Sequence, residues 1–256
     1  MPILWERDDQ VGIATIDRPD RRNALSTDLC DELASCLGAN RGLRVVIITG
    51  SGDKAFSAGA DLARRASDTA SLEHGGSDTF RPSFEALLDV IVGFPAPVLA
   101  AVNGAALGAG MQLAVSCDLR VAAPHATFGI PSGRLGVLLS ASNISRLATL
   151  VGQAMARDLL FTARPLNVAE AERVGLVQRR ADDVVGAARE LAAEIAAMAP
   201  LSIAGHKRAL NLVAGELAAQ SRDEIEALEA AAFQSADLQE GLTAFAEKRR
   251  PHFRGQ

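Results

Sequence analysis

The chain has 256 residues, of which 48% are hydrophobic and 22% charged, and its formal net charge is −5 at pH 7. This composition is typical of a globular protein with a full core, and the length predicts one large domain or two small ones. The negative net charge excludes a chain-wide basic field of the kind that attracts nucleic acid. An anionic ligand would therefore need a local cluster of basic residues.

Cysteine spacing and apolar runs indicate the compartment. Cys30, Cys36 and Cys117 match neither a disulfide framework nor a zinc motif, which is typical of reduced thiols in the cytoplasm. The N-terminal residues lack a basic segment followed by an apolar stretch, so we expect no signal peptide. The apolar run 98–113 is shorter than the ~20 residues of a membrane span and contains glycines. We expect a cytoplasmic protein without a membrane span.

The first half of the chain alternates between strand and helix patterns. Ser26 or Thr27 is the expected N-cap of a helix that carries leucines at i+4 spacing. The polar, Gly/Ser-rich stretch 67–78 predicts a lid over a ligand site, followed by a helix near 83–92. This alternation predicts an α/β fold with a mostly parallel sheet. The predicted strands are 3–6, 11–16, 44–49, 97–102 and 119–122.

The second half carries helical patterns throughout. Gly175 is an expected C-cap, and Pro200 separates two helices because proline is tolerated only in the first turn. The predicted helices are 141–151, 153–161, 168–174, 184–198, 201–214, 216–233 and 238–246.

Two turns of small residues are the strongest functional signal. Ala58-Gly59-Ala60 and Gly108-Ala109-Gly110 each follow a predicted strand region. Small side chains let backbone N–H groups approach a ligand closely, and two such groups stabilise negative charge on a carbonyl oxygen. A helix opening at 112–116 would add its positive dipole end. Either turn alone is equally explained by tight packing of a strand against a helix.

Together with four further segments, these turns resemble the crotonase (enoyl-CoA hydratase/isomerase) family. The resemblance implies an α/β fold with a ββα spiral acyl-CoA-binding core at 1–200 and a helical trimerisation region at 201–256. It also implies a homotrimer or a dimer of trimers, and coenzyme A as part of the ligand, with no prosthetic group. The further segments are Arg18–Leu25, Pro97–Gly104, Cys117–Ala122 and Phe245–Phe253.

The resemblance also places the reacting groups. In the family, two amides cradle the thioester oxygen, and these map to Ala60 and Ala109. Hydratases of the family place one glutamate just after the second turn and another twenty positions later, and here these become Gln112 and Ser132. A glutamine amide does not titrate, and a serine needs a base of its own. The chain thus resembles members that lack both catalytic glutamates.

Three interpretations of the chemistry stay open. In the first, the protein binds acyl-CoA without turning it over. In the second, it is an active lyase, isomerase or hydrolase of fatty-acid metabolism that uses a residue in or beside the lid, with His74 the best candidate on pKa grounds. In the third, Gln112 and Ser132 position a water in a weak enoyl-CoA hydratase. The other acidic candidates near the lid are Asp68, Glu73, Asp78 and Glu85.

The phosphates of coenzyme A require basic side chains. By resemblance, Arg22 lies near the nucleotide, Lys248 belongs to the C-terminal signature, and Asp61 is either a ligand contact or, as we prefer, a helix cap. Each basic residue has the alternative of an ordinary solvated face. The histidines show no metal-ligand spacing, so no metal site is expected. The remaining residues expected at the cofactor-binding site are Ala24, Ala58, Ala60, Leu62 and Ala109.

Overall fold

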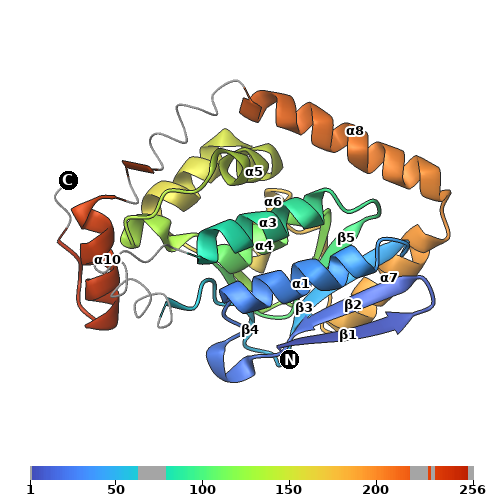
Figure 1. Cartoon of the computed structure of the whole chain (residues 1–256), viewed down its shortest axis with the longest axis horizontal. Helices are drawn as coiled ribbons and strands as arrows, with labels where there is room; N and C mark the ends of the chain where they lie inside the picture. The colour runs from blue at the N-terminus through green and yellow to red at the C-terminus, as the bar shows by residue number, and fades with distance from the viewer. Residues whose placement is uncertain (1, 63–78, 220–229, 232–233, 253–256) are drawn as a thin grey trace.

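A repeated unit of two strands and a following helix builds the body of the protein (Figure 1). The structure is a computed structural model that describes residues 2–62, 79–219, 230–231 and 234–252. In each unit the first strand joins a large sheet and the second joins a small sheet. The units comprise β3 (Val45–Gly50), β4 (Ala55–Ser57) and α3 (Phe80–Val92); β5 (Val98–Val102), β6 (Ala105–Leu107) and α4 (Ala109–Ser116); and β7 (Leu119–Ala122), β8 (Thr127–Gly129) and α5 (Ala141–Thr162).

The two sheets are mainly parallel, because each returning strand follows a crossover connection. The large sheet has the order β1-β2-β3-β5-β7-β10, and its antiparallel pair is the hairpin of β1 (Ile3–Asp8) and β2 (Val11–Ile16). The small sheet has the order β4-β6-β8-β9, in which β9 (Leu166–Asn167) is antiparallel. The ββα spiral and the five longer strands are confirmed. The short strands β4, β6, β8, β9 and β10 (Arg179–Arg180) were not predicted.

The large sheet lies in the core, as its uninterrupted apolar strands predicted. Every residue of β3 and β5 is buried. Helix α7 (Val184–Ala196) packs on β2, β3, β5 and β7, while α1 (Thr27–Ala39) packs against α3. Leu29, Leu33 and Leu37 of α1 are fully buried. Ser26 occupies the N-cap position of α1, as predicted. Its side chain, however, makes no capping hydrogen bond.

The helices of the second half differ from prediction mainly at their joints. The two helices expected at 141–151 and 153–161 form one assigned helix, α5, with a kink at Gly152, where φ is 76°. Helix α6 (Val168–Arg173) begins with a capping box of Asn167 and Glu170, and Gly175 follows it with φ 79°. The predicted helix 216–233 and the lid 67–78 lie wholly or largely outside the described residues.

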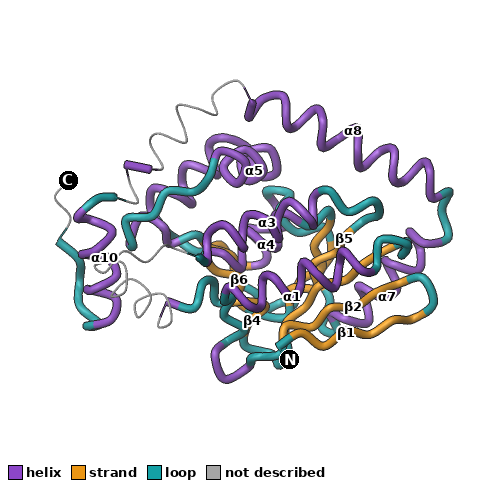
Figure 2. The backbone as a smooth tube through the Cα atoms, in the orientation of Figure 1, coloured by secondary structure: helices purple, strands orange, loops and turns teal. Residues whose placement is uncertain are grey.

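Helix α8 (Pro200–Ala219) runs along the outside of the body (Figures 1 and 2). It begins at Pro200, as predicted. The buried ammonium group of Lys207 anchors it, donating to the carbonyl oxygens of Ile91 and Ala96 and to the Asp118 carboxylate at 2.8 Å. Asp118 also accepts from the Val98 amide, so its role in this structure is to join α8 to the large sheet. The other side of α8 leaves large apolar side chains exposed: Leu201, Leu210, Leu212 and Val213.

Helix α10 (Ala236–Ala246) packs on the loop that follows β8. A β-carbon at Gly241 would lie 2.6 Å from the carbonyl oxygen of Leu135, so the two backbones touch. The segment after α10 folds back onto it through Arg249, which pairs with Glu240. None of the helices in the described ranges combines the length and the apolar character that crossing a membrane requires.

Candidate acyl-binding site

The first small-residue turn is held by a parallel bridge to the loop that precedes α1. The amide of Leu25 donates to the carbonyl oxygen of Gly59, and the amide of Asp61 donates to the carbonyl oxygen of Leu25, both at 2.8 Å. Gly59 and Asp61 thus both bond to Leu25, and Ala60 lies between them. In a parallel bridge, the N–H and C=O groups of this middle residue point away from the partner strand. The amide of Ala60 therefore points away from Leu25.

Two buried asparagines fix the corner from which this turn emerges. The side-chain amide of Asn23 donates to the carbonyl oxygens of Ser51 and Ala55, at 3.0 and 2.7 Å. Asn103 accepts from the amide of Gly50 and donates to the carbonyl oxygen of Gly52. These bonds satisfy backbone groups that a tight corner would otherwise leave unpaired, so they hold the position of the first turn.

The second turn opens α4, and this helix begins three residues earlier than expected. Gly108 is the N-cap with φ 54° and ψ −118°, and Ala109 is the first helical residue. The first amides of a helix have no partner within the helix. No described residue accepts a hydrogen bond from the amide of Ala109 or from that of Ala60. Because Ala109 adopts helical angles, alanine is accommodated there without strain.

The two turns touch each other because β4 and β6 pair in parallel. A β-carbon at Gly59, where φ is 99°, would lie 3.3 Å from the amide nitrogen of Ala109 and 2.8 Å from the carbonyl oxygen of Leu107. A β-carbon at Gly110 would lie 2.3 Å from the carbonyl oxygen of Ser57. Only glycine fits at these two positions, so the small residues are required for the contact.

Both turns border one cavity of about 590 Å³, and Ala60 and Ala109 are among its lining residues. The volume falls within the range of small-molecule sites. Apolar side chains from α3 and from the segment 135–139 form much of its wall, and Phe245 of α10 completes it. The predicted site residues that line this cavity are Ala24, Ala58, Ala60, Asp61, Leu62, Ala109, Gln112 and Ser132.

The two basic residues predicted from the resemblance do not line this cavity. Arg22 borders a neighbouring hollow of about 480 Å³ together with Lys54 and His125. Lys248 is exposed beyond the end of α10, with φ 55°. The arginines that do line the main cavity are Arg21, Arg81 and Arg134. Sequence reasoning missed Arg81 and Arg134, which are isolated in sequence and belong to no motif.

Asp61 takes part in an ion pair at the rim. Its carboxylate accepts from the Arg18 guanidinium at 3.0 Å, and Arg18 also donates to the carbonyl oxygen of Ala24. The side chain of Asp61 is 9% exposed, so this pair joins two loops on the cavity wall. The residues of the helix that Asp61 was expected to cap lie, after Leu62, outside the described residues.

Gln112 and Ser132 come to the cavity from different elements. Gln112 lies on α4, one turn after Ala109, and Ser132 lies in the 3₁₀ turn Pro131–Arg134. The described acidic residues that line the cavity are Asp61 and Glu85, the latter on α3. His74, Asp68, Glu73 and Asp78 lie outside the described residues. In the described part of the chain, no group of three or more potential metal ligands gathers.

Arg120 supports the far end of α4. Its guanidinium is 1% exposed and donates to the carbonyl oxygens of Ala114 and Cys117, at 3.1 and 2.8 Å, and to the side chain of Gln178 at 3.0 Å. A cation at the C-terminal end of a helix complements the helix dipole. Burial lowers the pKa of Arg120 to about 10. Sequence reasoning gave this residue no role, because its burial is visible only in the fold.

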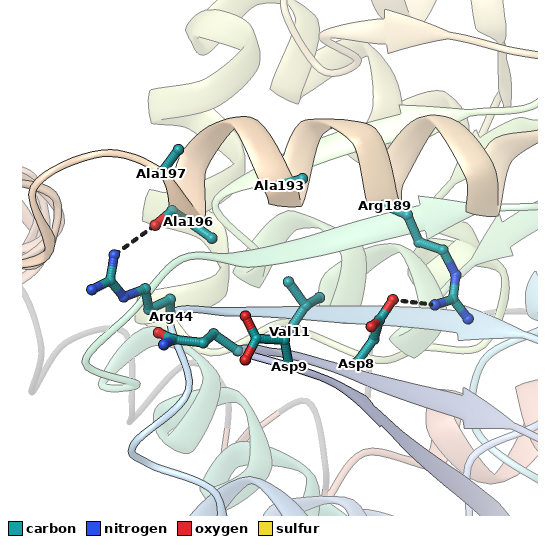
Figure 3. A pocket seen from close by; sticks show the side chains of 9 residues that line it. Asp8, Asp9, Val11, Arg44, Arg189, Ala193, Ala196 and Ala197 are labelled. Carbon is teal, nitrogen blue, oxygen red and sulfur yellow. Dashed lines mark hydrogen bonds and ion pairs between the residues drawn. The ribbon is translucent and has the colours of Figure 1, made fainter.

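A separate cavity of about 450 Å³ lies on the opposite edge of the large sheet, between the β1–β2 hairpin and the end of α7 (Figure 3). Asp8 is ion-paired with Arg189, and Arg44 donates to the carbonyl oxygen of Ala196 (Figure 3). These two contacts are the interactions that Figure 3 marks between the residues drawn. Neither small-residue turn reaches this cavity, so it is not the candidate site.

Comparison with known proteins identifies the family of the chain. Residues 6–256 match the model of the family described as enoyl-CoA hydratase/isomerase. A probable enoyl-CoA hydratase of Mycobacterium tuberculosis is 39% identical, over 98% of this chain and 97% of the relative. A Crotonyl-CoA hydratase of Syntrophomonas wolfei is 36% identical, over 98% of this chain and 97% of that protein.

Solved structures share the fold along the whole chain. An enoyl-CoA hydratase/isomerase from Pseudoalteromonas atlantica is 31% identical, with a TM-score of 0.86, and covers 99% of this chain and 100% of its own. Methylmalonyl-CoA decarboxylase in complex with 2-nitronate-propionyl-CoA is 27% identical, with a TM-score of 0.89, and covers 100% of this chain and 99% of its own. The protein belongs to the enoyl-CoA hydratase/isomerase family of the crotonase superfamily.

Proposed function

We propose that this protein binds acyl-CoA thioesters and that the amides of Ala60 and Ala109 hold the thioester oxygen as an oxyanion hole. The observation that carries the proposal is the contact of the two turns: Ala60 and Ala109 line one cavity, and no described residue accepts a hydrogen bond from either amide. Such amides stabilise the charge that develops when the α-carbon becomes enolate-like.

The chemistry of the site argues against ordinary hydration. Addition of water across a double bond needs one group to activate the water and another to handle the proton at the α-carbon. Gln112 and Ser132, at the two corresponding positions, supply neither. Each positioned acid or base contributes about 10²–10⁴ in rate, so crotonyl-CoA hydration should be slow. In a weak hydratase, Gln112 and Ser132 would only position a water.

Decarboxylation is the second candidate, and the similarity to methylmalonyl-CoA decarboxylase favours it. When an acyl-CoA that carries a carboxylate on its α-carbon loses CO₂, the electron pair of the breaking C–C bond passes through the α-carbon to the thioester oxygen. That step needs an oxyanion hole and no base to remove a proton, so non-titrating residues at 112 and 132 do not prevent it.

The cavity wall assigns candidate roles in binding coenzyme A. Ala24, Ala58 and Leu62 lie beside the two turns and are proposed to contact the ligand, with Asp61 holding the rim. Arg21, Arg81 and Arg134 are the nearer partners for its phosphates, because Arg22 and Lys248 do not line the cavity of a single chain. Coenzyme A is part of the ligand, and no prosthetic group enters the proposal.

We further propose a homotrimer or a dimer of trimers, with α8 at the contact. Leu201 and Leu210 are 89% and 70% exposed, and Val213 is 68% exposed. Apolar side chains gathered on one helix favour association with another protein surface. Within one chain, Lys207 and Asn211 bond α8 to the end of α3 and the loop after it, and α8 also contacts α5. A neighbouring subunit would cover the apolar side chains that remain exposed.

The proposed function is tested with butyryl-CoA and crotonyl-CoA. Titration calorimetry should show saturable binding of butyryl-CoA, while the enoyl absorbance of crotonyl-CoA stays nearly constant. The double variant Gln112→Glu/Ser132→Glu is the matched comparison, since it restores both carboxylates and should hydrate faster than the wild type. Methylmalonyl-CoA with detection of released CO₂ tests the second candidate. Rapid loss of enoyl absorbance by the wild-type protein would overturn the proposal of impaired hydration.

A further inference from the structure

A carboxylate outside the two expected positions lies on the cavity wall. Glu85 occupies the second turn of α3 and is partly exposed to the cavity. Its neighbour Phe84 is buried and faces the core, which fixes the rotation of the helix. The other described acidic residue on the wall is Asp61. Glu85 therefore brings an acid–base group to a cavity whose usual acid–base positions hold an amide and a hydroxyl.

The orientation of Glu85 is set by a buried residue of α5. Its Oε1 accepts a hydrogen bond from Nδ2 of Asn143 at 2.9 Å, and Asn143 is 3% exposed. The other side-chain atom of Asn143, Oδ1, accepts from Arg146 at 2.9 Å. Because both ends of the Asn143 amide are engaged, its NH₂ group must face Glu85. A side chain held in this way is pre-organised for proton transfer.

Glu85 lies beside the N-terminal end of α5. Asn143 lies in the first turn of α5, whose N-cap Ser140 also lines the cavity. The N-terminal end of a helix carries partial positive charge, which stabilises a nearby anion. Helices α3 and α5 both contact α4, whose first amide belongs to Ala109. The base and the proposed oxyanion hole thus belong to walls of the same cavity.

We propose that Glu85 is the catalytic base that removes a proton from the α-carbon of a bound acyl-CoA. The C–H bond breaks, its electron pair passes to the thioester oxygen, and the proton forms a bond to Glu85. The amides of Ala60 and Ala109 hold the resulting enolate oxygen. Reversal of the step returns a proton to the carbon. The inference rests on the proposed binding function and adds an activity, reversible enolisation, for which one base suffices.

Exchange of the α-hydrogens of butyryl-CoA with solvent deuterium measures this step directly. The protein is incubated with saturating butyryl-CoA in D₂O, and incorporation is followed by NMR and mass spectrometry. The wild type should exchange faster than the protein-free control. In Glu85→Gln, the rate should fall by about 10²–10⁴. The amide oxygen of the new side chain still accepts from Asn143, so butyryl-CoA affinity by calorimetry should remain within about threefold.

The control variant is Glu172→Gln, which makes the same chemical change on α6, where Glu172 pairs with Arg180 away from the cavity. Its exchange rate should equal that of the wild type. Absence of exchange in a wild-type protein that binds butyryl-CoA overturns the inference and leaves the binding function standing. Equal exchange in the wild type and Glu85→Gln also overturns it. Absence of binding overturns both proposals.

Discussion

Gly59 and Ala109, fifty residues apart in sequence, are so close that a β-carbon at Gly59 would lie 3.3 Å from the amide nitrogen of Ala109. Gly59 also has φ 99°, a conformation that other residues rarely adopt. The two turns thus depend on one glycine both for their backbone conformation and for their contact.

Replacing Gly59 with valine should separate the turns. The side chain would meet the carbonyl oxygen of Leu107, and the positive φ would cost about 1–3 kcal/mol. We expect acyl-CoA affinity to fall at least about tenfold and the melting temperature to drop by several degrees. Gly38→Ala, in α1, is the control, because a β-carbon added there would meet no other part of the protein within 4 Å. Wild-type affinity in Gly59→Val would contradict the proposed cradle.

Removing the Arg120 side chain should destabilise α4 from its far end. Arg120→Met leaves the carbonyl oxygens of Ala114 and Cys117 without their charged donor in a buried environment. We expect the free energy of unfolding to fall by about 3 kcal/mol or more, measured by urea denaturation. Arg157→Met, which changes an exposed arginine of α5, should stay within about 0.5 kcal/mol of the wild type. Similar stability of the two variants would show that Arg120 does not support α4.

Acid should loosen the segment that follows α10 from this helix before it affects the body of the protein. Glu240 of α10 accepts hydrogen bonds from the Arg249 side chain and from the His252 amide. These bonds lower the pKa of Glu240 from 4.5 to about 2. A carboxylate with a lowered pKa stabilises the folded state fully above its unfolded pKa and loses that contribution as the pH falls toward the folded pKa. Hydrogen exchange of α10 amides should therefore accelerate between about pH 4.5 and 2.

Glu240→Gln is the matched variant for this pH effect. Its α10 amides should exchange faster than those of the wild type already at pH 7, and the additional acceleration in acid should be smaller. Because Phe245 of α10 lines the cavity, acyl-CoA affinity should weaken in the same direction. Identical pH profiles in the wild type and the variant would exclude the Glu240–Arg249 contact as the acid-sensitive element.

The exposed side of α8 should determine the assembly state. Leu210→Asp/Val213→Asp places two charges on side chains that are 70% and 68% exposed, so the folded monomer should tolerate them. Light scattering after size exclusion should show a trimer or hexamer for the wild type and smaller species for the variant. Leu4→Asp, on β1, should leave the assembly unchanged. A wild-type protein that is monomeric at all concentrations would contradict the proposed trimer.

Long apolar patterns allowed much of the fold to be predicted. The uninterrupted runs that became β3 and β5 predicted buried strands, and the leucines of α1 predicted a buried helix face. The short strands of the small sheet gave no such signal, because β4 and β6 have three residues each and consist largely of alanine and other small residues. The predicted start of α4 was three residues too late, because glycines lower the intrinsic helix propensity of Gly-Ala-Gly. In the structure Ala109 and Gly110 are helical because packing holds them there.

The lining of the candidate cavity was predicted from sequence where backbone turns form it and missed where distant side chains form it. Ala60 and Ala109 line the cavity, as expected of the two turns, because small residues in a turn mark close backbone approach. Arg81 and Arg134 carry no sequence signal, since nothing local indicates which surface they face. Glu85 was one of several acidic candidates near the predicted lid. Its place on the cavity wall and its contact with Asn143 are visible only in the structure.

Infrared difference spectroscopy of bound butyryl-CoA, labelled with ¹³C at the thioester carbonyl, tests the account most directly. Two amides that donate to one oxygen weaken the carbonyl bond, so the stretching band should move to lower wavenumber than in water, and Gly59→Val should lose most of that shift. A band in the bound wild-type complex at the position of the free thioester would show that the amides of Ala60 and Ala109 do not hold this oxygen.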